Sequence, residues 1–248
     1  MFAPLTYVQE NSAAMPSVAE RRKRNRQEMV NGILSAARAQ MREEGVAALN
    51  LNEVARRVGV TTPALYKYFA SKMAVYDALF RVGNRLYVEE LKALNLGEAE
   101  SARVAIGGAF EHQLGFGARN PELYQLVLQR PVPGFVPSAE GLVEAAEAEQ
   151  VAIRLVARWI ERGLIAPQGP PERAFAMLAS VAAGLTSNRI ANEPNLPAGE
   201  GLFESLVPEA ASIFAKAWAP AKTKGSRTRV LRGSTRKKRG KSGGRAHA

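Results

Sequence analysis

Residues 61–67 carry hydroxyl, methyl and ammonium groups directly after a glycine turn at Gly59. Such groups suit hydrogen bonds and apolar contacts with base edges in a DNA major groove. Pro63 fits the first turn of a helix capped by Thr61, because the N–H that proline lacks would have no partner there. We expect this helix to turn outward the side chains of Thr61, Thr62, Pro63, Ala64 and Lys67.

Phenol and ammonium groups follow the same segment at Tyr66, Tyr68 and Lys72. They can contact the flanking phosphates, which fixes the register of a protein on DNA without reading its sequence. The two tyrosines are two residues apart on the expected helix, so they point to different faces. At most one of them can therefore lie in the core.

The basic residues gather at the two ends of the chain. Lys and Arg exceed Asp and Glu by 34 to 23, and residues 221–248 alone hold 11 basic side chains and no acid. Residues 1–80 carry 11 basic and 7 acidic side chains, whereas residues 81–220 carry 12 and 16. A basic start, an acidic middle and a basic end fit a protein whose two ends meet a polyanion.

Both basic ends are expected to be disordered. The segment RRKRNR at residues 21–26 can follow the DNA backbone or enter the minor groove, with Arg24 and Arg26 among its side chains. Residues 221–248 hold too few large apolar side chains to fold alone. We interpret this tail as a non-specific DNA tether. A solubility tail and an RNA or membrane patch are the alternatives.

Residues for catalysis are scarce. The chain has no cysteine, which excludes a disulfide framework, a thiolate zinc site and a cysteine nucleophile. His112 is the one histidine of the expected folded region, and on an apolar helix it suits a core or pocket hydrogen bond better than a metal. Without a phosphate-binding glycine loop, we expect neither an enzyme nor a cofactor. No apolar run approaches the roughly 18 residues of a membrane span, so we expect a cytoplasmic protein on the nucleoid.

The elements that must position these groups are helical almost throughout, and the sequence predicts an all-α fold. Gly45 is expected to end the first helix, and Asn50 with Glu53 fits a capping box at the start of the second. The expected helices cover about 26–44, 51–58, 61–69, a stretch from 71, and then 101–117, 122–128, 138–162, 171–190 and 201–218.

Residues 49–69 predict a helix-turn-helix. Two short helices meet through Gly59, with the small Ala55 at their approach. The small core between the helices is expected from Val54, Val58, Val60 and Leu65. An ordinary helical hairpin is the alternative, but the caps, the glycine and the outward polar face all agree with the first interpretation.

The segment from about 26 to 79 resembles the DNA-binding domain of the TetR family of bacterial repressors. The likeness rests on Ile33, Ala37, Gly45, Val54–Ala55, Gly59–Val60 and Leu65-Tyr66-x-Tyr68-Phe69-x-Ser71-Lys72. The family usually has His at the position of Tyr68, Glu at that of Met73, and Ser or Thr at that of Asn50. Tyr68 can still donate a hydrogen bond to phosphate. The expected DNA-binding residues are Arg24, Arg26, Asn50, Thr61, Thr62, Pro63, Ala64, Tyr66, Lys67, Tyr68 and Lys72.

Residues 95–220 resemble the ligand-binding and dimerisation half of one TetR subgroup. The likeness is carried by Asn120-Pro121-Glu122-Leu123-Tyr124, RPVPGFVPS and GLTSNRIANEP. It implies a helical body whose last two long helices form a four-helix dimer interface. Residues that could line a ligand cavity are Phe110, His112, Phe116, Tyr124, Trp159 and Asn188. At helical spacing, the aromatic ones also fit plain packing.

The sequence thus predicts four parts: a disordered arm (1–22), a three-helix DNA-binding domain (23–72), a helical-bundle regulatory and dimerisation domain (73–220) and a basic tail (221–248). The expected function is sequence-specific regulation of transcription by a homodimer that binds duplex DNA at a palindromic operator. A small-molecule effector would release this repressor. The alternative is a ligand-independent architectural DNA-binding protein that uses the same basic ends.

Overall fold

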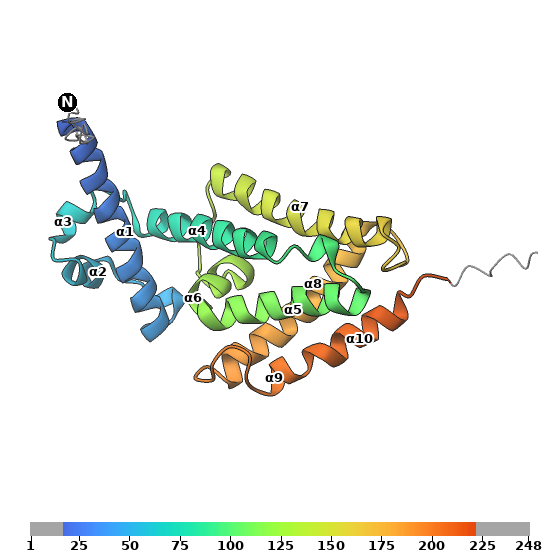
Figure 1. The fold of residues 1–248 in the computed structure, drawn as a ribbon. Coiled ribbons are helices and arrows are strands. Elements are labelled where there is room, and N and C mark those ends of the chain that lie inside the picture. The colour runs from blue at the N-terminus through green and yellow to red at the C-terminus, as the bar shows by residue number, and fades with distance from the viewer. Residues whose placement is uncertain (1–16, 222–248) are drawn as a thin grey trace, which may run out of the picture.

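The computed structural model describes residues 17–221, and every regular element in that range is a helix (Figure 1). The predicted all-α fold is confirmed there. Within residues 17–221 no helix combines the length and the apolar character needed to cross a membrane. The predictions for residues 1–16 and 222–248, which include most of the N-terminal arm and nearly all of the basic tail, lie outside the described residues.

The head of the molecule consists of α1, α2 and α3 at one end (Figure 1). It comprises α1 (Val18–Glu44), the 3-10 turn η1 (Val46–Ala48), α2 (Leu51–Arg57) and α3 (Thr62–Leu65). Gly45 ends α1 at a positive φ of 94°, and Gly59 follows α2 at 71°, so both turns use a backbone conformation that suits glycine. The predicted helix boundaries at these two glycines are confirmed.

The start of α1 differs from the prediction. The helix begins at Val18 and not near Arg26, because Ser17 and Glu20 form a complete capping box. Residues 18–22, which we expected in a disordered arm, are therefore helical. The signal was the spacing of Ser17 and Glu20, Ser-x-x-Glu, which the prediction did not use.

The body is built from long helices that begin with α4 (Lys72–Ala93), which leaves the head and packs against its neighbours (Figure 1). The remaining elements are η2 (Leu96–Glu98), α5 (Ala102–Arg119), α6 (Pro121–Tyr124), the π-helix η3 (Gln125–Gln129), α7 (Ala139–Glu161), α8 (Pro171–Asn192), α9 (Leu202–Ser205) and α10 (Val207–Ala217). Two expected helices are altered: 122–128 turns into a π-helix after Tyr124, and 201–218 is divided at Leu206.

Two hydrophobic clusters stabilise the fold. The first joins head and body, since Ile33, Val54 and Leu65 belong to the same cluster as Phe80 and Tyr124. The second lies within the body and contains Ile106, Trp159, Leu178 and Ala211. The head is therefore not joined to the body by a flexible linker alone, because it shares a hydrophobic core with α4 and α6.

Candidate nucleic-acid interface

The short helix α3 presents the residues that we predicted to read bases. Thr61 caps it by accepting a hydrogen bond from the backbone N–H of Ala64 at 3.4 Å. Thr61, Pro63 and Lys67 are exposed, and Thr62 and Ala64 are half-buried. Regular helix ends at Leu65, earlier than the predicted Phe69, and tighter turns carry the chain through Tyr68. Leu65 itself is fully buried and anchors the helix.

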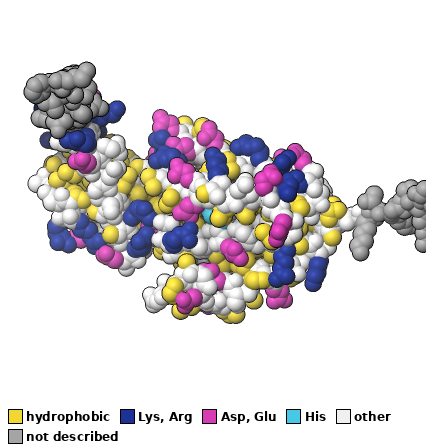
Figure 2. Space-filling view, in the orientation of Figure 1, with side chains coloured by type: hydrophobic (Ala, Val, Ile, Leu, Met, Phe, Trp, Pro, Cys, Tyr) yellow, Lys and Arg dark blue, Asp and Glu magenta, His cyan; other side chains and the backbone are white. Residues whose placement is uncertain are grey.

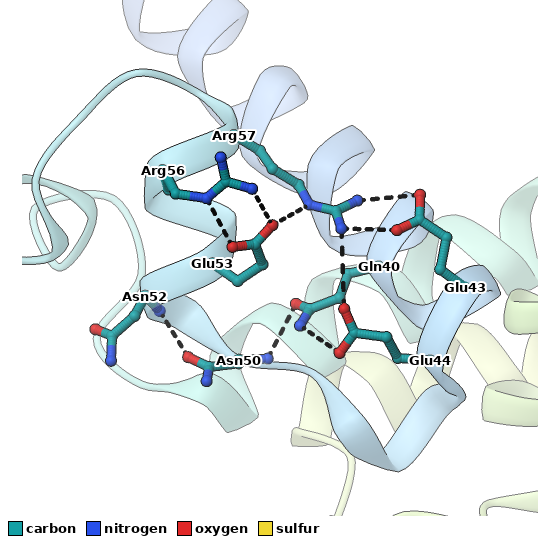
Figure 3. Close-up of polar contacts among 8 residues, drawn as sticks. All are labelled: Gln40, Glu43, Glu44, Asn50, Asn52, Glu53, Arg56 and Arg57. Atoms are coloured by element: carbon teal, nitrogen blue, oxygen red, sulfur yellow. Dashed lines mark hydrogen bonds and ion pairs between the residues drawn. The ribbon is translucent and has the colours of Figure 1, made fainter.

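A chain of hydrogen bonds fixes α3 against the rest of the head, and Figure 3 shows its part from Asn52 to Glu44. The hydroxyl of Thr62 donates to Asn52 Oδ1 at 2.9 Å, and the backbone N–H of Asn52 donates to Asn50 Oδ1 at 2.9 Å. The backbone N–H of Asn50 donates to Gln40 Oε1 at 3.1 Å, and Gln40 Nε2 donates to Glu44. These contacts lead from α3 through α2 to α1, so the three helices hold a fixed relative position.

Asn50 is the N-cap of α2, as predicted, but the capping box with Glu53 is not formed. Asn50 caps the N–H of Asn52 instead. The carboxylate of Glu53 forms ion pairs with Arg56 at 2.7 Å and with Arg57 at 2.8 Å (Figure 3). It therefore does not accept a hydrogen bond from the backbone at the start of α2.

This ionic cluster ties α2 to α1. Arg57 also pairs with Glu43 of α1 at 2.7 Å. Hydrogen bonds from Arg56 and Arg57 lower the pKa of Glu53 to about 2, so the carboxylate stays charged at neutral pH. The arginines of α2 are thus engaged within the head.

A hollow of about 370 Å³ lies beside α3 and is lined by three of the predicted DNA-binding residues, Asn50, Tyr66 and Lys72. Asn52 also lines it, and we had not predicted this residue. Asn52 could have been predicted from its position in the first turn of α2, two residues after the cap Asn50, where its side chain is exposed. Lys72 Nζ donates to the carbonyl of Leu49 at 3.0 Å, which holds the ammonium at the wall of the hollow.

Tyr66 and Tyr68 differ in environment. Tyr66 is 50% exposed, whereas Tyr68 packs partly against the core, in agreement with the expectation that not both are buried. The guanidinium of Arg26 lies 5.2 Å from the centre of the Tyr68 ring, and its Nη1 donates to the carbonyl of Lys67. Arg26 thus supports the turn after α3. Arg24 is exposed one turn away and makes only a 3.7 Å contact with Glu28.

The first turns of α1 carry exposed Lys and Arg residues, and basic side chains cluster on this end of the molecule (Figure 2). Because residues 21–26 are helical, they cannot act as an extended arm in the minor groove, which is only about 6 Å wide. Contacts with the phosphate backbone remain open to them.

A buried ionic contact joins the head to the body. The side chain of Glu122 on α6 has no exposed surface and pairs with Arg38 and Arg42 of α1, each at 2.7 Å. Arg38 also donates to Asn120 Oδ1 at 2.8 Å. The resemblance pointed to the Asn-Pro-Glu segment, but the residues that it meets lie about 80 positions earlier in the chain and could not be foreseen.

The six candidate ligand residues do not come together. Phe110 and Trp159 are packed in the second cluster, and Tyr124 is packed in the first. Asn188 is exposed on α8, where it donates to the carbonyl of Gly184. Only Phe116 lines a central cavity of about 560 Å³ between α4, α5, η3, α7 and α8.

Neither ring nitrogen of His112 makes a hydrogen bond of good geometry to another described residue, although the backbone of Tyr87 lies near enough to favour the protonated imidazole. Its ring packs edge-on against Tyr87 at 4.6 Å. Burial lowers the pKa of His112 to about 4; the nearby charge of Glu90 opposes this shift and that of Arg119 adds to it. The imidazole is therefore neutral at pH 7.

Comparison with known proteins bears on this head directly. Residues 33–79 match the family profile described as bacterial regulatory proteins, tetR family. The matched segment runs from the middle of α1 through α2 and α3 into α4. Residues 33–79 form a DNA-binding domain of the TetR family. TetR-family regulators are DNA-binding and non-enzymatic, so the head is the DNA-binding domain of a transcriptional regulator. No curated protein matches by sequence.

Solved structures extend the likeness to the whole described fold. A protein of unknown function from Rhodococcus sp. RHA1 is 20% identical, with a TM-score of 0.64 over 85% of this chain and 100% of that chain. The transcriptional regulator FadR of Bacillus subtilis, solved in complex with stearoyl-CoA, is 15% identical, with a TM-score of 0.58 over 75% of this chain and 97% of that chain. The TetR-family regulator PfmR of Thermus thermophilus is 17% identical, with a TM-score of 0.57 over 74% and 97%.

Proposed function

We propose that this protein is a ligand-released repressor that binds a near-palindromic operator as a homodimer. The observation that carries the proposal is the outward position of α3, whose Thr61, Pro63 and Lys67 are exposed while Leu65 anchors it. A helix-turn-helix places the first residues of its second helix at base edges in the major groove. In this reading Thr61, Thr62, Pro63, Ala64 and Lys67 face the bases.

The surrounding residues would contact phosphate. Asn50, Tyr66 and Lys72 share the hollow beside α3, which an oxygen of the backbone could enter. Arg24 would meet phosphates from the start of α1. Arg26 and Tyr68 lie against each other, so we assign them the support of the turn after α3 together with a phosphate contact from the phenol.

A dimer would place two copies of α3 in successive major grooves, about 34–36 Å apart. The face of α8 that stays exposed in one chain carries Ala176, Met177, Ser180 and Gly184. Its mostly small side chains let a second helix approach closely, and Met177 is 51% exposed. Ile213 of α10 is 59% exposed and apolar. These features support α8 and α10 as the four-helix interface.

The central cavity has the size of a small-molecule site, for which 300–1,000 Å³ is usual. Its walls are mainly apolar, and the polar side chains that line it are those of Asn84, Tyr87, Gln113, Arg130, Glu149 and Ser180. We propose that a largely apolar effector occupies it. The complex of Bacillus subtilis FadR with stearoyl-CoA supports this proposal, because a protein of similar fold binds an acyl ligand.

The route from cavity to head is short. Val127 and Leu128 of η3 line the cavity, and η3 continues directly from α6, which carries Glu122. An effector that displaces η3 would move Glu122 and, through Arg38 and Arg42, tilt α1. A ligand that prefers this tilted state weakens operator binding by its differential affinity, and DNA weakens ligand binding by the same factor.

Selection from a pool of random duplexes tests the proposal. The expected product is an inverted repeat with half-sites about one helical turn apart, bound by two chains. Enrichment of no sequence at all would contradict it and favour the architectural alternative. Addition of fatty acyl-CoAs to the complex should then release the operator if the cavity is the effector site.

A further inference from the structure

A second hollow of about 820 Å³ lies on the other side of α5. It is a groove between the end of α4, η2, α5 and the start of α10, and it shares no lining residue with the central cavity. Leu94 and Leu96 form one wall, and Val207 and Ala211 form the other. Leu96 packs onto Gly108 and Ala211 packs onto Gly107, so these two side chains also form the floor of the groove over α5.

One end of this groove is lined by His112, whose ring nitrogens lack hydrogen bonds. The side chain of His112 is only 2% exposed, and both its ring nitrogens are buried without a partner among the described residues. Nε2 lies 4.0 Å from Oε2 of Glu90, too far for a hydrogen bond. Glu90 is itself held by Arg119 at 2.7 Å, and all three residues line the groove.

The separation of 4.0 Å between Nε2 and Oε2 equals that of two atoms that share one bridging oxygen. Because both ring nitrogens are buried, a side-chain shift of Glu90 must open the space for it. A hydroxyl oxygen about 2.8 Å from each atom spans 4.0 Å with a bent geometry. It would accept a hydrogen bond from the imidazole N–H and donate its own hydrogen to the carboxylate. A carboxylate would be repelled by Glu90, and an ether or ketone could not donate to it.

We propose that the groove binds an uncharged amphiphile whose hydroxyl bridges His112 and Glu90 and whose apolar body lies between Leu96 and Val207. A lone water molecule could satisfy the same two atoms, but it would leave the apolar walls of the groove uncovered. From Val104 to His112 the groove follows two turns of α5, or about 12 Å, which suits a ring with a short alkyl chain. The site is independent of the central cavity and of its effector.

Three probes of one shape test this proposal: 4-butylphenol, 4-butylanisole and 4-butylbenzoate. Imidazole nitrogen shifts of the protein labelled with ¹⁵N-histidine report binding, since His247 is the one other histidine and serves as an internal reference. The resonance of His112 should move with 4-butylphenol, at an affinity about tenfold higher than for the ether or the benzoate. Equal binding of all three probes, or no shift at saturation, would overturn the proposal.

Substitutions in the groove and in the central cavity show which of the two hollows binds the probe. His112→Phe should weaken 4-butylphenol about tenfold in calorimetry and abolish its preference over the ether. Val104→Trp, at an exposed position on the groove, should block binding by its volume, whereas Ala146→Trp, exposed at the central cavity, should not. Circular dichroism confirms that each variant is folded. Loss of binding in Ala146→Trp but not in Val104→Trp would place the probe in the other cavity and contradict the assignment.

Discussion

The head and the body of this protein are organised differently. In the head, short helices are fixed by polar groups close together in sequence, as in the chain from Thr62 to Gln40. In the body, long helices enclose hollows of about 560 and 820 Å³. The head is built to present one surface to DNA, and the body leaves space for ligands. The contact between them decides whether an event in the body changes the DNA-binding surface.

The largest effect is expected from Glu122→Gln, which breaks the contact between head and body. Two arginines lose their charged partner, but both are partly exposed and can be rehydrated. We therefore expect the free energy of unfolding to fall by about 3 kcal/mol, at the low end for a buried pair. Urea denaturation measures the loss.

Glu98→Gln is the matched control, because Glu98 pairs with Arg158 at the surface, where both side chains are about half exposed. It should cost less than about 1 kcal/mol. Similar losses in both variants would mean that the buried contact does not couple the two regions.

The next effect concerns His112 in the body. Its folded pKa of about 4 lies below the unfolded value of 6.5, so the unfolded chain binds the proton first as the pH falls. Stability contributed by the neutral imidazole is present above pH 6.5 and is lost between pH 6.5 and 4, by about 2 kcal/mol at pH 5. Denaturation of His112→Phe should show a flatter pH dependence in this window; an unchanged slope would reject the assignment.

A smaller effect is expected from the tail. Deletion of residues 221–248 removes 11 positive charges and should lower DNA affinity about tenfold at low salt, with a flatter salt dependence and unchanged operator preference. A chain in which Gln replaces the tail's Lys and Arg separates charge from length. Gel-shift titrations across salt that give the same slope with and without the tail would remove the tether hypothesis.

The smallest effect is expected from Lys67→Gln in the head. The exposed ammonium lies at the turn after α3, and its loss should weaken operator binding severalfold and reduce the salt slope by about one. Lys92→Gln, at the exposed end of α4, is the control in the body and should leave binding unchanged. Equal effects of the two variants would argue against a DNA-facing head.

How much the sequence could predict also differs between the two regions. In the head, Gly45, Asn50, Thr61 and Gly59 act on neighbours within a few residues, and the elements that they delimit are confirmed. The early start of α1 had a local signal too, in Ser17 and Glu20. The loss of the capping box has a local signal in Arg56 and Arg57, which lie one turn from Glu53, but the contact of the Asn50 backbone N–H with Gln40 of α1 could not be foreseen.

In the body, the helices that begin after Ser101 and Ser138 are confirmed, because each serine caps its own helix. The ligand residues could not be found in this way, since periodicity marks Phe110 and Trp159 as apolar but not whether they face a cavity. The arginine partners of Glu122 and the burial of the unpaired ring nitrogens of His112 depend on the packing of segments that are distant in sequence.

The most direct test of the central claim is a charge placed at the start of α3. Thr61→Asp keeps a good helix cap but puts a carboxylate at the surface proposed to enter the major groove. Ser101→Asp makes the same change at a cap in the body. Competition between the selected operator and a shuffled duplex should show about a hundredfold loss of operator affinity for Thr61→Asp and none for Ser101→Asp. Wild-type operator affinity in folded Thr61→Asp would contradict the account.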